Sequence, residues 1–290
     1  MGESIYSEHA RLCGIPEAAE RSKGIDGEFV SALYSADEMM TVAAARMLRN
    51  DAVCFVGIGL PSTAANLARL THAPDAVLIY ESGPIGAKPP VLPLSIGDGN
   101  LAETADTVVS TPEIFRYWLQ GGRIDVGFLG AAQLDRFANI NTTVVGSYER
   151  PKVRLPGAGG APEISSSAKE VLVVVKHSKR TLVDKLDFVT SVGFLTGGDA
   201  REKAGITGRG PVAVITDLCI LRPNPASREL EVVSIHPEVD RSRICESTGW
   251  AIQFSEACTE TEAPRADELG VLRDLKARTV LAHGVQGDEA

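Results

Sequence analysis

Residues 52–81 read AVCFVGIGLPSTAANLARLTHAPDAVLIYE, and this stretch decides the fold. Two short apolar runs, 52–57 and 77–81, enclose a segment that starts at Pro61 and keeps helix-forming residues up to Leu70. Short apolar runs separated by a helix are typical of parallel strands that are buried on both faces of a sheet. The stretch therefore predicts a strand, a glycine-containing loop, a helix and a second strand parallel to the first.

The same alternation continues along the chain. Further strands are expected at 106–110, 124–130 and 170–175, and a helix is expected at 112–120. Near the end, the apolar runs 212–221 and 229–236 flank the turn Pro223-Asn224-Pro225 and predict a hairpin. We therefore expect an α/β fold, with an open, mostly parallel mixed sheet, helices on both faces and an antiparallel hairpin extension.

The two ends of the chain differ from the middle. Residues 1–34 are polar and lack periodicity, so we expect an N-terminal extension ahead of one domain that spans 35–284. Order is expected to begin at Ser35, which opens a capping-box pattern. A C-terminal helix is expected at about 265–282, and the tail 285–290 is expected to be disordered.

The composition limits the possible partners. The chain has 290 residues and a formal net charge of −9, so neither nucleic acid nor an anionic membrane is an expected partner. No apolar run approaches the roughly 18 residues of a membrane helix, and the first residues lack the apolar region of a secretory signal. The five cysteines show no C-x-x-C spacing. We therefore expect a cytoplasmic protein without a metal site.

The first candidate loop is Gly57-Ile58-Gly59-Leu60-Pro61, between a strand and a helix. In open α/β sheets, ligands bind beyond the carboxyl ends of the strands. Glycines allow a phosphate to come close to the backbone, and the start of a helix offers free N–H donors. Gly57 and Gly59 are therefore candidates for binding a phosphate-bearing ligand or an oxyanion. Two glycines also suit a plain tight turn, and the sequence leaves both interpretations open.

The second candidate is a carboxylate at the end of an apolar strand. Glu81 precedes Ser82 and Gly83, and further glycine and proline residues keep the following backbone open. A glutamate at a strand end is more often simply solvated than catalytic. Because two other loops of unusual composition accompany it, Glu81 is our candidate catalytic residue, with Ser82 and Gly83 lining the site.

The third candidate loop is PGAGGAP, residues 156–162. Such a loop exposes consecutive N–H groups, which suit an oxyanion or a pyrophosphate. The candidate residues for this role are Gly157, Gly159, Gly160 and Ala161. A flexible connection between strands is the alternative, but the basic residues just before the loop favour an anion site in an otherwise acidic protein.

Other chemistries have no motif behind them. The chain lacks G-x-S-x-G, so a serine-hydrolase triad has no support. It also lacks G-x-G-x-x-G and the P-loop pattern, so dinucleotide binding and phosphoryl transfer have none either.

Taken together and in this order, the three loops resemble those of the β subunit of family I CoA-transferases. That family carries a G-I-G-hydrophobic-P loop, a nucleophilic glutamate in E-[SN]-G and a later G-x-G-G-A loop. The resemblance covers about residues 35–260 and implies the CoA-transferase fold, which is similar to that of NagB and RpiA. Within the family, the segment from Tyr80 to Val109 looks closest to the β subunits of 3-oxoadipate CoA-transferases related to glutaconate CoA-transferase.

The resemblance implies a function. Glu81 would carry CoA as a glutamyl-CoA thioester during transfer from succinyl-CoA to 3-oxoadipate. The enzyme would need no cofactor, since coenzyme A enters as the substrate thioester. The resemblance also implies an α subunit as partner in a hetero-oligomer, with a small acyl-CoA and a dicarboxylate as ligands. Arg116, Arg123 and Arg154 could each bind the substrate carboxylate, and the sequence does not choose among them.

Three alternatives stay open. One is a hydrolase on the same fold that cleaves a CoA thioester or opens a ring. A second is another dicarboxylate CoA-transferase, such as one for glutaconate. The more remote third is a non-catalytic module that binds an effector, although residues 1–34 are too short and too acidic for the DNA-binding helices of such regulators.

Overall fold

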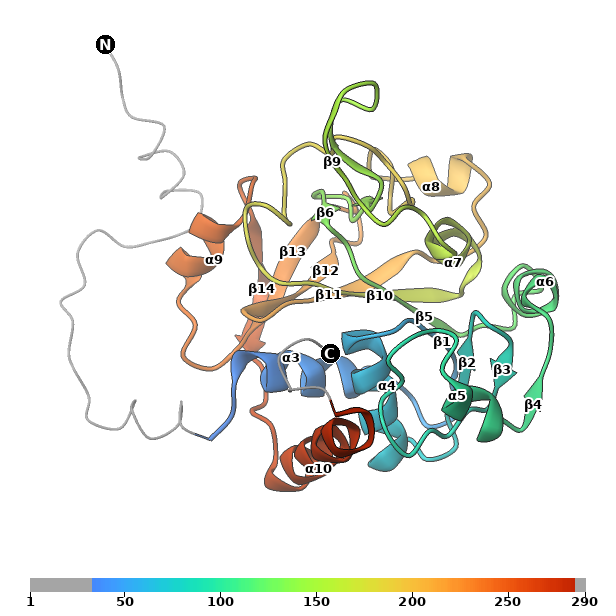
Figure 1. Cartoon of the computed structure of the whole chain (residues 1–290). Helices are drawn as coiled ribbons and strands as arrows, with labels where there is room; N and C mark the ends of the chain where they lie inside the picture. Colours follow the sequence, from blue (N-terminus) through green and yellow to red (C-terminus); the bar gives the residue numbers. More distant parts are fainter. Residues whose placement is uncertain (1–32, 285–290) are drawn as a thin grey trace, which may run out of the picture.

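The computed structural model describes residues 33–284, and a ten-stranded sheet forms the centre of this part of the chain (Figure 1). The strand order is β14-β13-β12-β11-β10-β5-β1-β2-β3-β4. The strands of this sheet are β1 (Val53–Val56), β2 (Val77–Tyr80), β3 (Pro84–Ile85), β4 (Thr107–Val108), β5 (Val126–Leu129), β10 (Glu170–Val174), β11 (Pro211–Ile215), β12 (Cys219–Pro223), β13 (Leu230–Ile235) and β14 (Gln253–Glu260). Two small hairpins lie beside it, formed by β6 (Gln133–Leu134) with β7 (Ile140–Asn141) and by β8 (Val144–Gly146) with β9 (Pro151–Arg154).

The centre of the sheet is parallel and its two sides are antiparallel. Strands β11, β10, β5, β1 and β2 run in the same direction. Strands β12 and β13 extend one side as antiparallel neighbours, and β14 then pairs parallel with β13. Strands β3 and β4 extend the other side, also antiparallel. The expected mixed, mostly parallel sheet with an antiparallel extension is confirmed, and a second antiparallel side adds to it.

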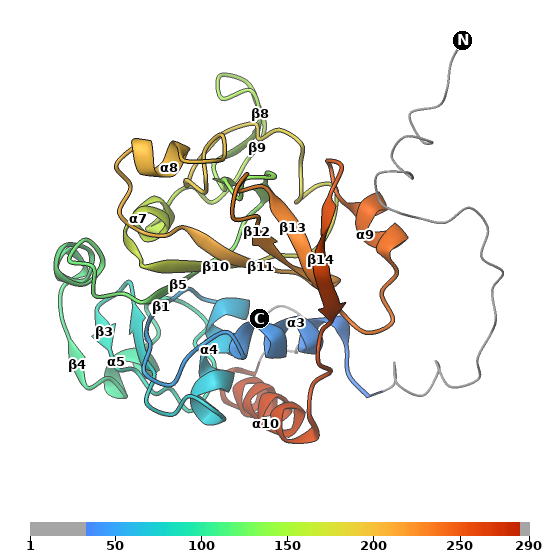
Figure 2. The same ribbon diagram turned by 180° about the vertical axis from the view of Figure 1, so that it is seen from behind.

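Helices cover both faces of the sheet, as expected (Figures 1 and 2). The helices are α3 (Ala36–Ala45), α4 (Leu60–Leu70), α5 (Gly99–Glu103), α6 (Thr111–Glu113), the π-helix η1 (Ile114–Leu119), α7 (Ala161–Ser167), α8 (Ala200–Lys203), α9 (Arg241–Ser247) and α10 (Ala266–His283). Helices α3, α4 and α10 lie together on one face, and α7 lies on the other. The expected C-terminal helix is therefore present as α10.

Strand alternation divides the buried side chains between the two faces. Cys54 and Leu78 point into the core under α3 and α4, whereas their chain neighbours Phe55 and Ile79 point into the core under α7 and η1. Successive side chains of a strand point to opposite faces of the sheet, so each central strand contributes to both cores. The continuous apolar runs of the sequence reflect this burial on both sides.

Ser35 starts the first described helix as the sequence predicts. The Ser35 hydroxyl accepts a hydrogen bond of 3.2 Å from the Glu38 N–H, and the Glu38 carboxylate accepts one of 2.8 Å from the Ser35 N–H. Two N–H groups that a helix start would otherwise leave without partners are thereby satisfied.

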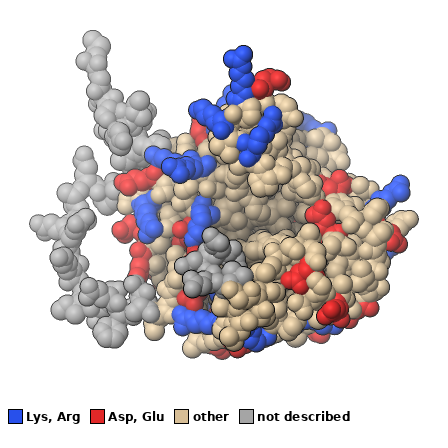
Figure 3. Space-filling view, viewed as in Figure 1, with Lys and Arg blue, Asp and Glu red and all other residues tan. Residues whose placement is uncertain are grey.

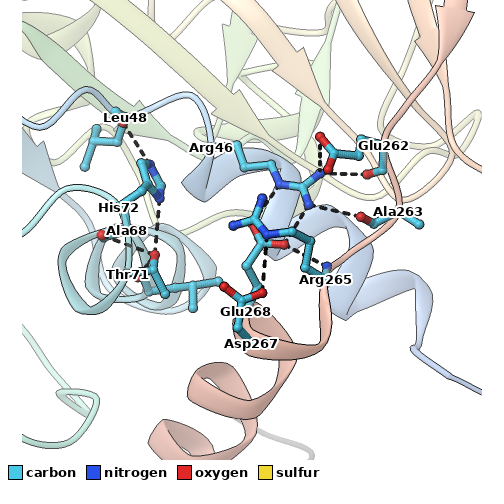
Figure 4. Close-up of polar contacts among 11 residues, drawn as sticks. Arg46, Leu48, Ala68, Thr71, His72, Glu262, Ala263, Arg265, Asp267 and Glu268 are labelled. Atoms are coloured by element: carbon cyan, nitrogen blue, oxygen red, sulfur yellow. Dashed lines mark hydrogen bonds and ion pairs between the residues drawn. The ribbon is translucent and has the colours of Figure 1, made fainter.

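An ion pair between the partly buried Arg46 and the buried Glu268 joins the end of α3 to the start of α10 (Figure 4). Arg46 Nε donates to Glu268 Oε1 at 2.8 Å, and Arg46 Nη2 donates to Glu268 Oε2 at 2.6 Å. Arg46 also donates to the carbonyls of Glu262 and Ala263. Burial alone would raise the pKa of Glu268, but the hydrogen bonds from Arg46 and from the Arg265 N–H outweigh it and lower that pKa.

One strand prediction was wrong in detail. The run 212–221 is not a single strand but the antiparallel pair β11 and β12, joined by a turn at 216–218. Thr216 makes the turn, because its Oγ1 accepts hydrogen bonds from the N–H groups of Leu218 at 3.1 Å and Cys219 at 3.0 Å. A threonine hydroxyl that binds nearby N–H groups is a local alternative to a strand ladder. The hairpin predicted after it exists as β12 and β13.

Residues 1–32 and 285–290 lie outside the described residues, so the extension over 1–34 and the disordered tail stay predictions, as does the domain boundary at residue 35. Within the described part of the chain, no helix combines the length and the apolar character that crossing a membrane requires.

Candidate active site

The first two candidate loops leave the same edge of the sheet side by side. Strand β1 pairs parallel with β2, and Val56 lies opposite Tyr80. The next residues, Gly57 and Glu81, are therefore neighbours at the carboxyl edge. The strand after β2 in the parallel part, β5, returns to the other side of β1, so the strand order reverses next to Gly57. Such a reversal is where open α/β sheets bind their ligands.

The loop after β1 needs a glycine at one position. Gly59 has φ +79° and ψ −137° and lies directly ahead of α4. Residues with a side chain rarely adopt this backbone conformation, whereas glycine adopts it without steric strain. The Gly59 carbonyl accepts the Thr63 N–H at 3.0 Å and so starts the helix. The backbone at 57–59 is partly exposed.

Glu81 occupies a tight turn between β2 and β3. The strand ends at Tyr80, one residue earlier than expected, and the Gly83 N–H closes the turn by donating to the Tyr80 carbonyl at 3.0 Å. Gly83 has φ +121°, and a Cβ there would lie 2.0 Å from the Val109 carbonyl oxygen. Glycine is therefore required at 83, and Ser82 is exposed at the tip of the turn.

A buried polar network fixes the strand end that carries this turn. The hydroxyls of Tyr80 and Ser62 share a hydrogen bond of 3.1 Å, and Asn66 Nδ2 donates to the Tyr80 hydroxyl at 3.2 Å. All three side chains are buried, and burial raises the pKa of Tyr80. Because Tyr80 points toward α4, the alternation of the strand sends Glu81 toward the opposite face, where α7 lies.

The third loop is held from below by a threonine. The Gly157 N–H donates to the Thr142 carbonyl at 2.9 Å, and Thr142 Oγ1 donates to the Gly157 carbonyl at 2.7 Å. Gly157 has φ +107° and Gly159 has φ +50°, and both are values that favour glycine. Thr142 belongs to the segment that follows β7. The sequence alone does not show that this segment supports the third loop.

The second and third loops meet at Gly160. This glycine is buried, and a Cβ placed on it would lie 3.2 Å from Glu81 Oε2. Two loops that are 79 positions apart in the sequence are thus in contact through a carboxylate and a bare glycine backbone. A Cβ at 160 would lie only 2.8 Å from Phe115 Cζ as well, so glycine is required where the two loops approach each other.

The N–H groups of the third loop differ in availability. The Ala161 N–H already donates to the Ala158 carbonyl at 3.0 Å. Within the described residues, the N–H groups of Gly159 and Gly160 donate to no acceptor. Of the four candidate donors for an oxyanion, those of Gly159 and Gly160 are therefore unpaired, whereas those of Gly157 and Ala161 are committed to backbone carbonyls.

The sequence did not predict the aromatic side chain beside Glu81. Phe115 lies in η1, and its Cζ and Cε1 atoms are 2.8 and 3.1 Å from the Cβ position of Gly160. The predicted helix over 112–120 exists, but most of it is a π-helix, in which the Gln120 N–H donates to the Phe115 carbonyl at 2.9 Å. Single-turn π-helices occur often at functional sites.

The three candidate arginines have different surroundings. Arg116 follows Phe115 and is exposed. Arg123 lies over the ring of Trp118, 5.9 Å from its centroid, and Arg154 lies 4.9 Å from the ring centroid of Tyr148. Lys and Arg side chains gather over the part of the surface that carries β8 and β9 (Figure 3). Arg154 of β9 therefore belongs to this basic part of the surface, and no contact joins it to Glu81 within the described residues.

Cavities also occur away from the three loops. One of about 390 Å³ is lined by Phe194, Arg201 and Arg228 among others, and none of its lining residues belongs to the three loops. Arg201 is buried there and donates to the carbonyls of Gly208, Gly193 and Ser165, and burial lowers its pKa to about 10. Arg201 thereby ties α7 to two neighbouring loops.

Residues 37–247 match the sequence model of the family described as Coenzyme A transferase. The chain belongs to the coenzyme A transferase family. Family membership leaves the alternative of a non-catalytic effector-binding module without support, because the relatives that follow are named as enzyme subunits.

Two relatives and one solved structure define the position within the coenzyme A transferases. The chain is 71% identical over 256 residues to the B subunit of 3-oxoadipate CoA-transferase from Pseudomonas knackmussii, a match that covers 88% of this chain and 98% of that relative. It is 32% identical over 247 residues to the B subunit of glutaconate CoA-transferase from Acidaminococcus fermentans, with 83% and 92% covered. The crystal structure of glutaconate CoA-transferase from the same organism matches with a TM-score of 0.78 at 30% identity, covering 83% of this chain and 94% of that chain.

Proposed function

We propose that this chain is the catalytic subunit of a two-subunit enzyme that transfers CoA from succinyl-CoA to 3-oxoadipate, with Glu81 as the covalent carrier. The carrying observation is the approach of Glu81 to Gly160, in which the carboxylate Oε2 lies 3.2 Å from the position that a Cβ would take on this glycine. The choice of substrate is supported by the 71% identity to the B subunit of a 3-oxoadipate CoA-transferase.

A carboxylate suits this exchange because it can form both an anhydride and a thioester. Glu81 attacks the carbonyl carbon of succinyl-CoA, the C–S bond breaks, and CoA leaves as a thiolate. The thiolate then attacks the Glu81 carbonyl of the mixed anhydride, which releases succinate and leaves the glutamyl-CoA thioester. The acceptor acid takes CoA by the same steps in reverse, and Glu81 is regenerated as a carboxylate.

The third loop is proposed to stabilise the charge that develops in each attack. Every attack on a carbonyl builds an oxyanion, and the unpaired N–H groups of Gly159 and Gly160 belong to the loop that approaches Glu81 at Gly160. One such donor typically lowers the barrier by about 2.7–4 kcal/mol. Gly57 and Gly59 are proposed to hold CoA at the neighbouring loop. The proposed reaction needs no cofactor, because coenzyme A enters as part of the substrate thioester.

The proposal includes an α-type partner subunit and a reaction in the cytoplasm. Relatives of this chain are named as B subunits, so a second chain belongs to the enzyme. Glu81 lies in a partly exposed turn at the edge of the sheet, which a second chain can cover. The chain purified alone is expected to lack transferase activity, and the activity is expected to appear when it is produced together with its partner.

The direct test is a competition between acceptor acids with the two-subunit enzyme. With succinyl-CoA as donor, 3-oxoadipate is expected to exceed acetoacetate in specificity by about one to two powers of ten, since one charged contact to the distal carboxylate contributes about 1.5–3 kcal/mol. Glutaconate is the second dicarboxylate to compare. If the specificity for acetoacetate equals that for 3-oxoadipate, the assignment of 3-oxoadipate as the acceptor is overturned. Release of free CoA without exchange between acids would indicate a hydrolase.

A further inference from the structure

Phe115 is fixed in an unusual helical turn. In η1 the N–H groups of Gln120 and Arg123 donate to carbonyls five residues earlier, those of Phe115 and Trp118, each at 2.9 Å. Ile114 and Leu119 anchor the two ends of this turn in the core. The Phe115 ring packs edge-on against Phe55 of β1, with 6.1 Å between centroids and 60° between planes. The ring therefore has little freedom to move.

The ring edge and the Glu81 carboxylate face the same point. Measured from the Cβ position of Gly160, Phe115 Cζ is 2.8 Å away and Glu81 Oε2 is 3.2 Å away. The two atoms can therefore be no more than about 6 Å apart. Apart from Gly160 and its two chain neighbours, the three atoms closest to this point among the described residues are two carbons of Phe115 and this one oxygen. Across the Cβ position of Gly160, the carboxylate thus faces an aromatic edge that offers no ordinary hydrogen bond.

An apolar wall at this place has a chemical consequence. In the proposed cycle, Glu81 is three times an activated acyl group, in an anhydride, then in a thioester and then in a second anhydride, and water can attack each of them. A bound water needs two to four polar partners, so it is unfavourable against an aromatic edge. Closing a site against water also prevents the hydrolysis of reactive intermediates.

We propose that Phe115 is a specificity-determining residue that keeps water from the Glu81 carbonyl, so that CoA passes to an acid rather than being lost by hydrolysis. The inference rests on the proposed function of Glu81. The side reaction it prevents is attack of a water oxygen on the glutamyl carbonyl carbon. The C–S bond then breaks, CoA leaves and is protonated to the thiol, and Glu81 returns as a carboxylate with release of one proton to solvent.

The test uses the two-subunit enzyme with Phe115→Leu and Phe115→Ala. Formation of the acceptor acyl-CoA and release of free CoA thiol are measured in the same reaction, and their ratio is the readout. The free-thiol fraction is expected to rise by about tenfold in Phe115→Leu, which corresponds to a small change in barrier, and further in Phe115→Ala. The matched control is Tyr117→Ala, on the same π-helix but 58% exposed, which is expected to leave the ratio unchanged.

A second measurement separates a role against water from simple loss of packing. The enzyme is loaded with succinyl-CoA, freed of excess substrate, and the mass of the CoA adduct on this chain is followed over time. The adduct is expected to decay about tenfold faster in Phe115→Leu than in the wild type. If the adduct decays equally fast in the variant and the wild type and the ratio of free CoA to acyl-CoA is unchanged, the role of Phe115 is overturned and the proposed function stands. The same holds if transfer and hydrolysis fall by the same factor.

If the wild type forms no adduct and exchanges no CoA, both proposals are overturned. If Phe115→Ala fails to fold, the result for Phe115→Leu decides.

Discussion

Glu81 and Glu268 are two carboxylates of one chain in opposite circumstances. Glu268 is 3% exposed, and both of its oxygens accept hydrogen bonds, from Arg46 and from the Arg265 N–H. Within the described residues, Glu81 accepts no hydrogen bond and pairs with no cation, and its Oε2 lies 3.2 Å from the Cβ position of a glycine that also adjoins an aromatic ring. A carboxylate whose lone pairs accept hydrogen bonds and whose charge is balanced has a structural role. A carboxylate with free lone pairs can attack a carbonyl.

The largest effect that separates the two is expected for Glu81→Gln. The amide keeps the size of the side chain but is not a nucleophile, so CoA transfer should fall below detection while the melting temperature stays within the range of the wild type. A rate only ~10²–10⁴ lower would fit a general base instead. Steady-state kinetics of the two-subunit enzyme decide this, and retained ping-pong behaviour at such a residual rate would contradict the covalent role.

The reverse result is expected at the junction of α3 and α10. Arg46→Met leaves the Glu268 charge buried with only Arg265 beside it, and breaking a buried pair costs about 3 kcal/mol or more in the free energy of unfolding. Urea unfolding measures this loss, and the rate per folded enzyme should not change. Lys203→Met is the control, because its exposed pair with Asp199 contributes at most about 1 kcal/mol. An equal loss in both variants would remove the distinction.

Acid should expose the same difference in a graded way. The folded-state pKa of Glu268 lies below its ordinary value, so its ion pair stabilises the fold above the ordinary carboxyl range and this contribution is lost as pH falls through the folded pKa. Chemical unfolding between pH 6 and pH 3 follows this loss. We expect the wild type to lose more stability over this range than Glu268→Gln. Parallel pH curves for the two proteins would argue against it.

The smallest effect is expected for Tyr80→Phe, beneath the site. Removal of the hydroxyl takes one partner from Ser62 and Asn66, but these two still bond to each other, so the cost should be near 1 kcal/mol in the free energy of unfolding. Tyr148→Phe is the matched control at an exposed position and should stay within about 0.5 kcal/mol. No difference between the two tyrosines would mean that the network does not hold the strand end.

The part of the site that could be predicted was the part made of local patterns. Glu81 follows an apolar strand, and the glycines of the first and third loops stand out in the sequence next to it. The pairing of Arg46 with Glu268 could not be predicted, since 222 positions separate them and each is an ordinary surface residue type by itself. The turn at Thr216 was missed although Thr216 and Asp217 interrupt the apolar run, because two polar residues in a row also suit a partly exposed strand.

Phe115 could not be predicted for a different reason. The pattern of residues 112–120 suits any helix, and nothing in it specifies hydrogen bonds to the fifth rather than the fourth residue. Only the structure, in which the Phe115 ring and Glu81 both approach Gly160, shows that the two side chains are neighbours.

The π-helical turn also has a consequence for insertions and deletions in this lineage of enzymes. A π-turn holds one residue more than an α-turn, so loss of a single residue from 116–119 would restore ordinary helical spacing. The π-turn takes up its extra residue locally, so after such a loss the Phe115 carbonyl would still meet the Gln120 N–H, now four residues later. The residues between them would shift around the helix axis, while the two ends of the segment keep their faces. The segment could therefore lose one residue without displacing the aromatic ring from Gly160.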